Sequence, residues 1–214
     1  MTAMTKFVIL LGGDVTPTQR LRRQLANAAV IAADSGIGHA ALLGLTPLLW
    51  IGDFDSSTAE QKKTYAHIPH QTYNAEKDAT DGELAISEAL RRGASELVLV
   101  GGFGGQFDHT MAHVSFLLSL TRRDIQVFMT SGHEEAHVLN NDLEFTDIAI
   151  GTRISVVPVT DLKALTLAGV KWPLNRRDVP LGSALTLSNV VTGPVDIKLK
   201  FGTALVVFYP RELD

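Results

Sequence analysis

Residues 48–57, LLWIGDFDSS, join a run of apolar residues to a turn that contains glycine and aspartate. Such an unbroken apolar run is typical of a parallel strand that is buried on both faces of a sheet. The runs FVILL at 7–11, VIA at 30–32 and LVLV at 97–100 also lead into glycine or aspartate. Helices are expected between them, at about 17–27, 37–43, 58–66, 81–92 and 109–121. This alternation predicts a doubly wound, mainly parallel α/β domain over residues 1–135.

The pattern changes after about Asn140, where apolar and polar residues begin to alternate. The clearest case is VDIKLKF at 195–201, which has the period of a strand with one buried face. The residues expected to face a core are Val195, Ile197, Leu199 and Phe201. Glycines at 151, 169, 182, 193 and 202 separate short segments of this kind. The pattern predicts a small C-terminal all-β sandwich or barrel domain over residues 136–214.

Composition narrows the possible classes of protein. The chain has 214 residues, 45% of them hydrophobic, and a formal net charge of −4. Since no run of Lys and Arg is longer than two residues, a nucleic-acid partner is not expected. The first apolar run, at 7–11, is too short for a signal peptide or a membrane span. The sequence has no cysteine, so disulfides are excluded and a cytoplasmic location is expected.

Acidic residues follow several of the predicted strands. Asp53 and Asp55 stand two residues apart, and in an extended segment they would point to the same side and repel each other unless a cation lay between them. Ligands of open α/β sheets bind beyond the carboxyl ends of the strands. The residues expected there are Asp34, Ser35, Asp53, Asp55, Lys77, Asp78, Asp81 and the segment GGFGGQFDH at 101–109. Magnesium suits such a site because it prefers carboxylate and phosphate oxygens.

These residues also have a purely structural explanation. Ser57 with Glu60, and Thr80 with Glu83, have the spacing of helix capping boxes. Asp108 could cap the helix that follows it. Each explanation is adequate for one residue alone, whereas convergence on a single edge of the sheet favours a binding site.

The glycine-rich segment at 101–109 provides a complementary feature. Four glycines allow backbone N–H groups to approach an anion at the start of the following helix. The segment is not a Walker A loop, because no Gly-Lys-Ser/Thr sequence follows it, and it is not GxGxxG. Acids and glycines together indicate a site for magnesium and phosphate.

Several segments together resemble the thiamine pyrophosphokinase family. They are AADSG (32–36), GDFDS (52–56), KDATDGELA (77–85), GGFGGQFDHTMA (101–112), GTRISVVPV (151–159), LAGVKWPL (167–174) and LSN (187–189). The resemblance implies an α/β catalytic domain and a β domain that helps to bind thiamine. It further implies a homodimer whose active site lies between the catalytic domain of one subunit and the β domain of the other. The implied reaction transfers the diphosphoryl group of ATP to the hydroxyethyl oxygen of thiamine, giving thiamine diphosphate and AMP.

Roles for individual residues follow from this resemblance. Asp53, Asp55 and Asp78 are expected to bind magnesium, and Asp81 and Asp108 complete the expected catalytic set. Asp108 and Asp78 are also the candidates for the general base. The residues expected to contact the nucleotide are Asp34, Ser35, Lys77, Gly102, Gly104, Gly105, Gln106 and His109. Those expected to contact thiamine are Ser188, Asn189 and Trp172, the last by ring stacking. Family members commonly have arginine where this chain has Gln106.

Two other functions remain open at this point. The same acids would serve another magnesium-dependent phosphotransferase or a phosphohydrolase. A non-catalytic protein that binds thiamine or a nucleotide is the second alternative. Thiamine-dependent formation of AMP would distinguish a thiamine pyrophosphokinase from both alternatives.

Overall fold

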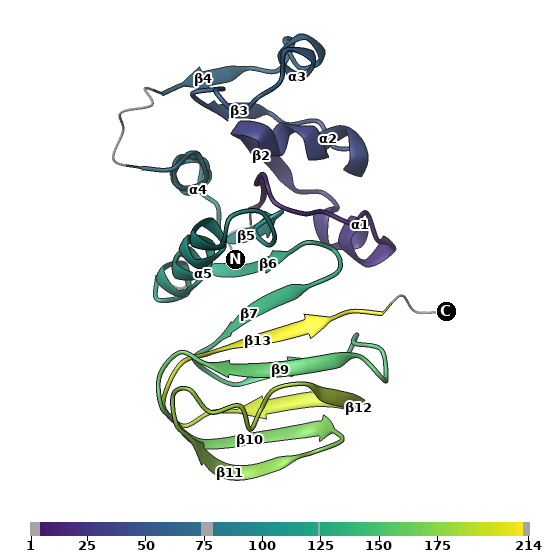
Figure 1. Ribbon diagram of the computed structural model, residues 1–214, viewed down its shortest axis with the longest axis vertical. Coiled ribbons are helices and arrows are strands. Elements are labelled where there is room, and N and C mark those ends of the chain that lie inside the picture. The colour runs from purple at the N-terminus through teal and green to yellow at the C-terminus, as the bar shows by residue number, and fades with distance from the viewer. Residues whose placement is uncertain (1–4, 74–78, 124, 212–214) are drawn as a thin grey trace. The chain divides into compact units, whose positions relative to one another are not determined.

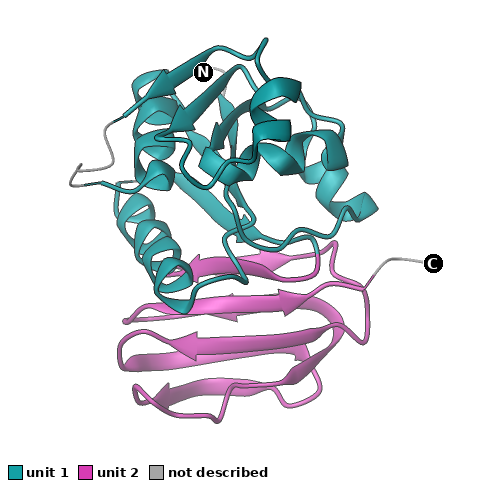
Figure 2. Ribbon diagram, turned by 45° about the horizontal axis from the view of Figure 1, so that its top comes forward, with its two compact units in different colours: residues 1–132 teal, residues 133–214 magenta. Residues whose placement is uncertain are grey.

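The computed structural model describes residues 5–73, 79–123 and 125–211. Its chain divides into two compact units, unit 1 (Met1–Gly132) and unit 2 (His133–Asp214), which Figure 2 shows in different colours. Within the described residues, no helix combines the length and the apolar character that crossing a membrane requires.

Unit 1 contains a parallel sheet with the strand order β6-β5-β1-β2-β3-β4. Its strands are β1 (Lys6–Leu10), β2 (Ala29–Ala33), β3 (Leu49–Gly52), β4 (His70–Thr72), β5 (Glu96–Val100) and β6 (Gln126–Thr130). Its helices are α1 (Gln19–Leu25), α2 (Gly38–Leu43), α3 (Ala59–Thr64), α4 (Asp81–Arg91) and α5 (Phe107–Thr121), with a 3₁₀ turn, η1 (Asp34–Ile37). The predicted α/β class is confirmed, and the strand order changes direction at β1, which pairs with both β2 and β5.

Helices cover both faces of this sheet. Val8 and Leu10 of β1 share a buried cluster with Leu21 of α1 and Ala40 of α2. Helix α4 packs against β1, β2 and β3, and α5 packs against β6. Figure 1 shows α1 and α2 on one side of the sheet and α4 and α5 on the other. Because both faces are covered, the edge formed by the carboxyl ends of the strands remains available for ligands.

Unit 2 is an antiparallel β domain, as predicted. Its strands are β7 (Glu135–Leu139), β8 (Leu143–Phe145), β9 (Arg153–Pro158), β10 (Leu162–Val170), β11 (Leu174–Val179), β12 (Asn189–Lys198) and β13 (Ala204–Tyr209). Strand β12 pairs with β9 at its start, with β8 nearer its end and with β10 along most of its length, so it connects two groups of strands. Their apolar faces enclose one cluster of buried residues, which includes Ile154, Val195, Ile197 and Phe208.

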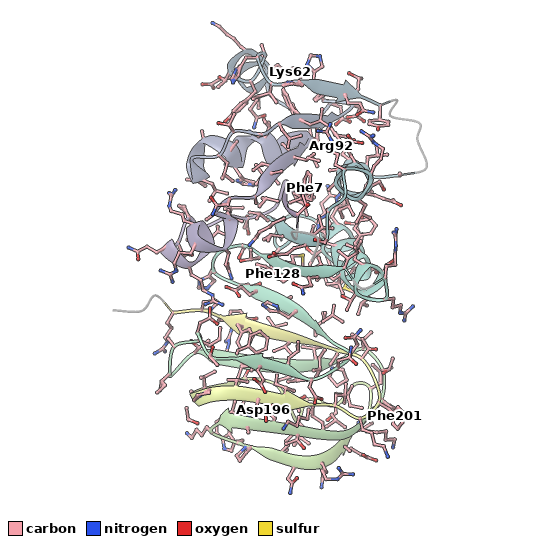
Figure 3. All side chains as sticks on the ribbon, turned by 180° about the vertical axis from the view of Figure 1, so that it is seen from behind. Phe7, Lys62, Arg92, Phe128, Asp196 and Phe201 are labelled. Atoms are coloured by element: carbon pink, nitrogen blue, oxygen red, sulfur yellow. The ribbon has the colours of Figure 1, made fainter. Side chains whose placement is uncertain are left out.

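The prediction for one core residue of unit 2, Phe201, is wrong. Val195, Ile197 and Leu199 are buried as predicted, but Phe201 is 64% exposed. Strand β12 ends at Lys198, so the alternation does not extend to position 201. Figure 3 shows Phe201 at the periphery of unit 2, where the Lys200 ammonium lies 5.4 Å from the centre of its ring.

Candidate active site

Three carboxylates meet at the ends of two neighbouring strands of unit 1. Asp34 directly follows β2, and Asp53 and Asp55 follow β3, which pairs with β2 in parallel. One oxygen from each of these carboxylates lies within 4.8 Å of the others. Three negative charges at this spacing repel one another strongly, and a hard dication would neutralise them. This acid cluster, Asp34, Asp53 and Asp55, has the donor chemistry that magnesium requires. Asp34 was predicted to contact the nucleotide, and the structure adds it to the possible metal ligands.

The electrostatic environment of Asp34 is unfavourable for a negative charge. Burial raises the pKa of this carboxyl above its ordinary value, a hydrogen bond from Ser57 partly offsets that rise, and the charges of Asp81 and Asp53 add to it. The Ser57 hydroxyl donates to Asp34 Oδ1 at 3.1 Å, and the Ser56 hydroxyl donates to Oδ2. A bound cation would reverse the repulsion, so the arrangement favours binding a cation over leaving these acids without one.

The backbone between the two acids of GDFDS is not extended. Phe54 has a φ of 63°, in the left-handed region that non-glycine residues seldom adopt. The expectation that Asp53 and Asp55 share a side because of extended backbone is therefore wrong. A turn brings them together instead, and the Asp55 N–H donates to Asp53 Oδ1 at 3.1 Å.

Trp50 anchors this turn. Its ring meets Phe54 edge to face, with 4.7 Å between the ring centres, so Phe54 turns back toward the core. The indole N–H of Trp50 donates to the backbone carbonyl of Asp34 at 2.8 Å. Asp34 also has positive φ, 42°. Because such backbone conformations are costly, the surrounding contacts are needed to hold Phe54 and Asp34 in place.

The loop after β5 lies at the same edge of the sheet. Gly104 has a φ of 76°, and a side chain there would collide with the carboxylate of Asp14 from the loop after β1. Two backbone hydrogen bonds join the two loops: Gly13 N–H to the Gly101 carbonyl, and Asp14 N–H to the Phe103 carbonyl, both 2.8 Å. This close approach explains the glycines of the segment.

The predicted nucleotide residues of this loop occupy different environments. Gly102 is buried, whereas Gly104, Gly105, Gln106 and His109 are exposed. Helix α5 begins at Phe107, two residues earlier than predicted, with Gln106 as its N-cap residue. Asp108 is therefore not the N-cap, and its carboxylate accepts from the His109 N–H at 2.9 Å.

The segment that precedes α4 is only partly described. Lys77 and Asp78 lie outside the described residues. Thr80 caps α4 as predicted, since its hydroxyl accepts from the Glu83 N–H at 3.2 Å, and Asp81 lies in the first turn. Asp81 belongs with the acid cluster electrostatically, because its charge raises the pKa of Asp34.

The capping box of α3 differs from the prediction by one residue. Thr58 with Gln61, rather than Ser57 with Glu60, makes both hydrogen bonds of the box. Ser57 is thereby free of a capping role and donates to Asp34 instead. Ser35, in η1, is half-buried, and its hydroxyl approaches Gly12 closely.

Unit 2 brings the three predicted thiamine residues together. Trp172 is 55% exposed, and Ser188 is exposed with a positive φ of 56°. Asn189 is only 5% exposed, and its side chain hydrogen-bonds to the backbone of Trp172. Ser188 and Trp172 therefore offer surface to a ligand, while Asn189 supports that surface from within.

Sequence reasoning missed four residues near the edge of unit 1. Asp14 follows β1, so the rule about strand ends would have found it. Ser57 was predicted only as a capping residue, and Ser56 was given no role. No rule of this kind would have found His39, because its contact with the Gly13 carbonyl joins segments far apart in the sequence.

Two family models match this chain over most of its length. The model described as "Thiamin pyrophosphokinase, catalytic domain" matches residues 22–129. The model described as "Thiamin pyrophosphokinase, vitamin B1 binding domain" matches residues 137–206.

Individual proteins give the same result. The thiamine pyrophosphokinase of Bacillus subtilis is 30% identical over 165 residues, which cover 74% of this chain and 76% of that protein. A crystal structure of thiamine pyrophosphokinase from Bacillus subtilis superposes with a TM-score of 0.85 at 25% identity, covering 97% of this chain and all of the other. The structure of a thiamin pyrophosphokinase family protein from Enterococcus faecalis has a TM-score of 0.79 at 22% identity, covers 98% of this chain and all of the other, and supports the fold.

Proposed function

The chain belongs to the thiamine pyrophosphokinase family, and we propose that it transfers the diphosphoryl group of ATP to the hydroxyethyl oxygen of thiamine. The observation that carries this proposal is the acid cluster at the ends of β2 and β3, on the same sheet edge as the glycine-rich loop after β5. Diphosphoryl transfer requires charge neutralisation and in-line positioning more than covalent help from the protein. Carboxylates that hold a dication and backbone N–H groups that face phosphate supply both.

In the proposed reaction, the thiamine hydroxyl oxygen forms a bond to the β-phosphorus of ATP. The bond between that phosphorus and the oxygen bridging the α- and β-phosphates breaks, and AMP leaves. The hydroxyl proton passes to a general base, for which Asp108 and Asp78 remain the candidates. Asp34, Asp53 and Asp55 would hold magnesium, with Asp78 as a further predicted ligand. Bound there, magnesium would neutralise phosphate charge.

The remaining predicted residues divide between the two substrates. Ser35, Lys77, Gly102, Gly104, Gly105, Gln106 and His109 are proposed to line the nucleotide part of the site, with Asp81 beside the acid cluster. Ser188, Asn189 and Trp172 are proposed to form the thiamine part. The exposed indole of Trp172 supports ring stacking on a planar cationic acceptor. An acidic crevice also suits thiamine, which is a cation.

The test is incubation of the purified protein with ATP, magnesium and thiamine, followed by identification of the products. AMP and thiamine diphosphate should form only when thiamine is present, and Asp53→Asn should abolish their formation. Glu144→Gln, which neutralises an exposed acid on β8, is the matched control and should keep full activity. Release of ADP would indicate a simple phosphotransferase, and hydrolysis without thiamine a phosphohydrolase. Binding of thiamine without any product would indicate a non-catalytic protein.

We also propose that the active site is completed in a homodimer. Phe107 is 78% exposed, and Met111 lies one helical turn later on the same exposed face of α5. In unit 2, Leu185 and Leu187 are exposed beside Ser188, in the region that also carries Trp172. Large apolar side chains gathered at both predicted parts of the site support their burial against a second copy of the chain.

Mixing two inactive variants tests this arrangement. Asp53→Asn removes a proposed metal ligand from unit 1, and Ser188→Ala combined with Trp172→Ala removes acceptor contacts from unit 2. If each site uses residues of two subunits, co-expressed hybrid dimers regain one intact site and part of the activity. Hybrids with no more activity than either parent would contradict a shared site, and a monomer in sedimentation would contradict the dimer.

A cytoplasmic location is proposed as well, in keeping with a sequence that has no cysteine.

A further inference from the structure

Two histidines hold the glycine turns that follow the central strands β1 and β5. Each strand leads into a glycine pair, Gly12 and Gly13 after β1, and Gly101 and Gly102 after β5. The carbonyl of the second glycine of each pair lies at hydrogen-bond distance from a histidine ring. His39 Nε2 of α2 is 2.9 Å from the Gly13 oxygen, and His113 Nδ1 of α5 is 3.0 Å from the Gly102 oxygen.

The chemistry of these contacts defines the tautomer of each ring. A backbone carbonyl only accepts hydrogen bonds, so the nitrogen that faces it must carry the hydrogen. His39 is therefore protonated at Nε2 and His113 at Nδ1. Burial lowers the pKa of both imidazoles below the ordinary value, which favours neutral rings with one N–H each. Each ring acts as a fixed donor directed at one peptide group.

His113 also lies against a second part of the site. A side chain built on Gly82, in the first turn of α4, would come within 3.8 Å of His113 Nε2. One built on Gly102 would come within 3.5 Å of its Nδ1. The ring is thus placed between the glycine-rich loop and the start of the helix that carries Asp81.

Holding a carbonyl also sets the direction of the next N–H, because the two point in opposite directions across a trans peptide bond. For the peptide between Gly13 and Asp14, the carbonyl is held by His39 and the N–H donates to the Phe103 carbonyl. For the peptide between Gly102 and Phe103, the bond to His113 directs the Phe103 N–H away from that ring. Glycine restricts the rotation on its own side of such a peptide very little, so the sequence alone does not fix the orientation.

We propose that His113 and His39 are positioning residues for binding the phosphate groups of ATP. His113 fixes the direction of the Phe103 N–H, and His39 fixes the peptide between Gly13 and Asp14, whose N–H joins the two glycine turns. Rotation of the peptide between Gly102 and Phe103 would put a carbonyl oxygen where the Phe103 N–H now points, which would replace attraction by repulsion for a phosphate there. The inference rests on the proposed function only in taking ATP as the nucleotide. Neither histidine needs to touch the substrate.

Substitutions can remove or restore the donor at the same place. His113→Phe keeps a planar ring and removes the N–H, whereas His113→Asn places an amide N–H near the former Nδ1. At the other turn, His39→Phe removes the donor and His39→Gln places an amide N–H near the former Nε2. His67→Phe, at an exposed position, is the control for replacing a histidine by phenylalanine.

We expect His113→Phe to lower kcat/KM for ATP by roughly 10-fold or more, with a change in KM for thiamine of less than about 2-fold. His113→Asn should recover most of the loss, His39→Phe and His39→Gln should show the same contrast, and His67→Phe should match wild type. Calorimetric binding of ATP with magnesium provides a second readout that does not depend on turnover. It should show weaker binding for both Phe variants and recovery in the amide variants.

The possible negative results distinguish failure of the proposed function from failure of the inference about the two histidines. A wild-type protein that binds ATP but forms no AMP would contradict the proposed function and leave the binding comparison decisive for the histidines. Unchanged ATP affinity and kcat/KM in both Phe variants would overturn the inference. Equal losses in the Phe and amide variants would overturn it too, because they would show that ring packing rather than the donor matters. If His113→Phe does not fold, the His39 pair decides by the same criteria.

Discussion

The side-chain amide of Asn189 forms two reciprocal hydrogen bonds with the backbone of Trp172. Asn189 Nδ2 donates to the Trp172 carbonyl at 2.8 Å, and the Trp172 N–H donates to Asn189 Oδ1 at 3.1 Å. The same oxygen accepts from the Val190 N–H at 2.9 Å. Most of the hydrogen-bonding capacity of this buried amide is thus used within the protein, and its main effect on an acceptor would pass through Trp172.

This relationship predicts a non-additive effect on thiamine binding. Asn189→Ala removes bonds to three backbone groups and should cost about 1 to 3 kcal/mol of unfolding free energy, besides raising KM for thiamine. Trp172→Ala should also raise KM for thiamine, and the double variant should be little worse than Trp172→Ala alone. Steady-state kinetics with thiamine varied at saturating ATP measure the cycle. Additive increases in KM would show that Asn189 contacts thiamine independently.

Replacing Asp34 of the acid cluster by asparagine should raise thermal stability in the absence of magnesium and should remove the stabilisation that magnesium gives. Because the pKa of Asp34 is raised by burial and by neighbouring charges, its ionised form costs stability when no cation is bound. Asp34→Asn should therefore raise Tm in EDTA, by an amount that solvent screening of this half-buried group keeps small. Added magnesium should raise the Tm of wild type and leave that of the variant nearly unchanged.

Thermal unfolding monitored by calorimetry gives both comparisons in one series. Glu144→Gln serves as the control, because it removes the same charge at an exposed position of β8 and should respond to magnesium as wild type does. A magnesium-dependent shift of equal size in Asp34→Asn would show that Asp34 is not a ligand.

A second acid of unit 1 should control stability at low pH. Glu88 of α4 receives hydrogen bonds of 2.7 Å from Arg91 Nε and from Arg92 Nε. The bond from Arg91 is the main reason that the pKa of Glu88 falls to about 2, against an ordinary value of 4.5. A depressed carboxyl pKa means that the stabilisation is complete above about pH 4.5 and is lost as the pH falls toward 2.

Glu88→Gln should therefore reduce the free energy of unfolding by about 1 to 2 kcal/mol at pH 7, a modest value because Arg91 is largely exposed. The difference from wild type should shrink as the pH falls below 4.5. Urea titrations at pH 7 and at low pH measure it. The same difference at both pH values would show that charge on Glu88 does not stabilise α4.

The position of Gln106 predicts a gain of nucleotide affinity when positive charge is added. Gln106 is exposed at the start of α5, and among the described residues its side chain makes no capping hydrogen bond. Gln106→Arg would introduce a bidentate donor for phosphate at the loop after β5. We expect KM for ATP to fall roughly 3- to 10-fold, less so at high salt. Gln126→Arg, an equal change of charge at the exposed start of β6, should leave KM unchanged.

Strands β1, β2, β3 and β5 could be predicted from the sequence because each is a continuous apolar run that leads into glycine or aspartate. Strand β4 is short, polar and exposed, and β6 leads into serine, so neither carries this signal. Phe201 was misplaced because alternation in a sequence does not reveal where a strand ends. Strand ends also located Asp53, Asp55 and Asp81. The joint position of Asp34 with Asp53 depends on the pairing of β2 with β3, which the sequence does not specify.

The proposed positioning role of His113 and His39 could not be predicted from the sequence. The ring of His113 donates a hydrogen bond to the carbonyl of Gly102, which lies eleven residues earlier in a different element. Its spacing follows no motif, because the contact is made by tertiary packing rather than by local geometry. The same holds for the left-handed conformation of Phe54, whose ring packs against Trp50 and His70.

The placement of the two tryptophans has a practical consequence. Trp50 is buried and bonded to the backbone of Asp34, whereas Trp172 stands half in solvent in the other unit. The sequence contains no other indole. A buried indole emits at shorter wavelength than a hydrated one, so the two emission bands would separate. The chain thus carries one intrinsic optical probe beside each proposed half of its site, and filling of the two halves could be followed without a label.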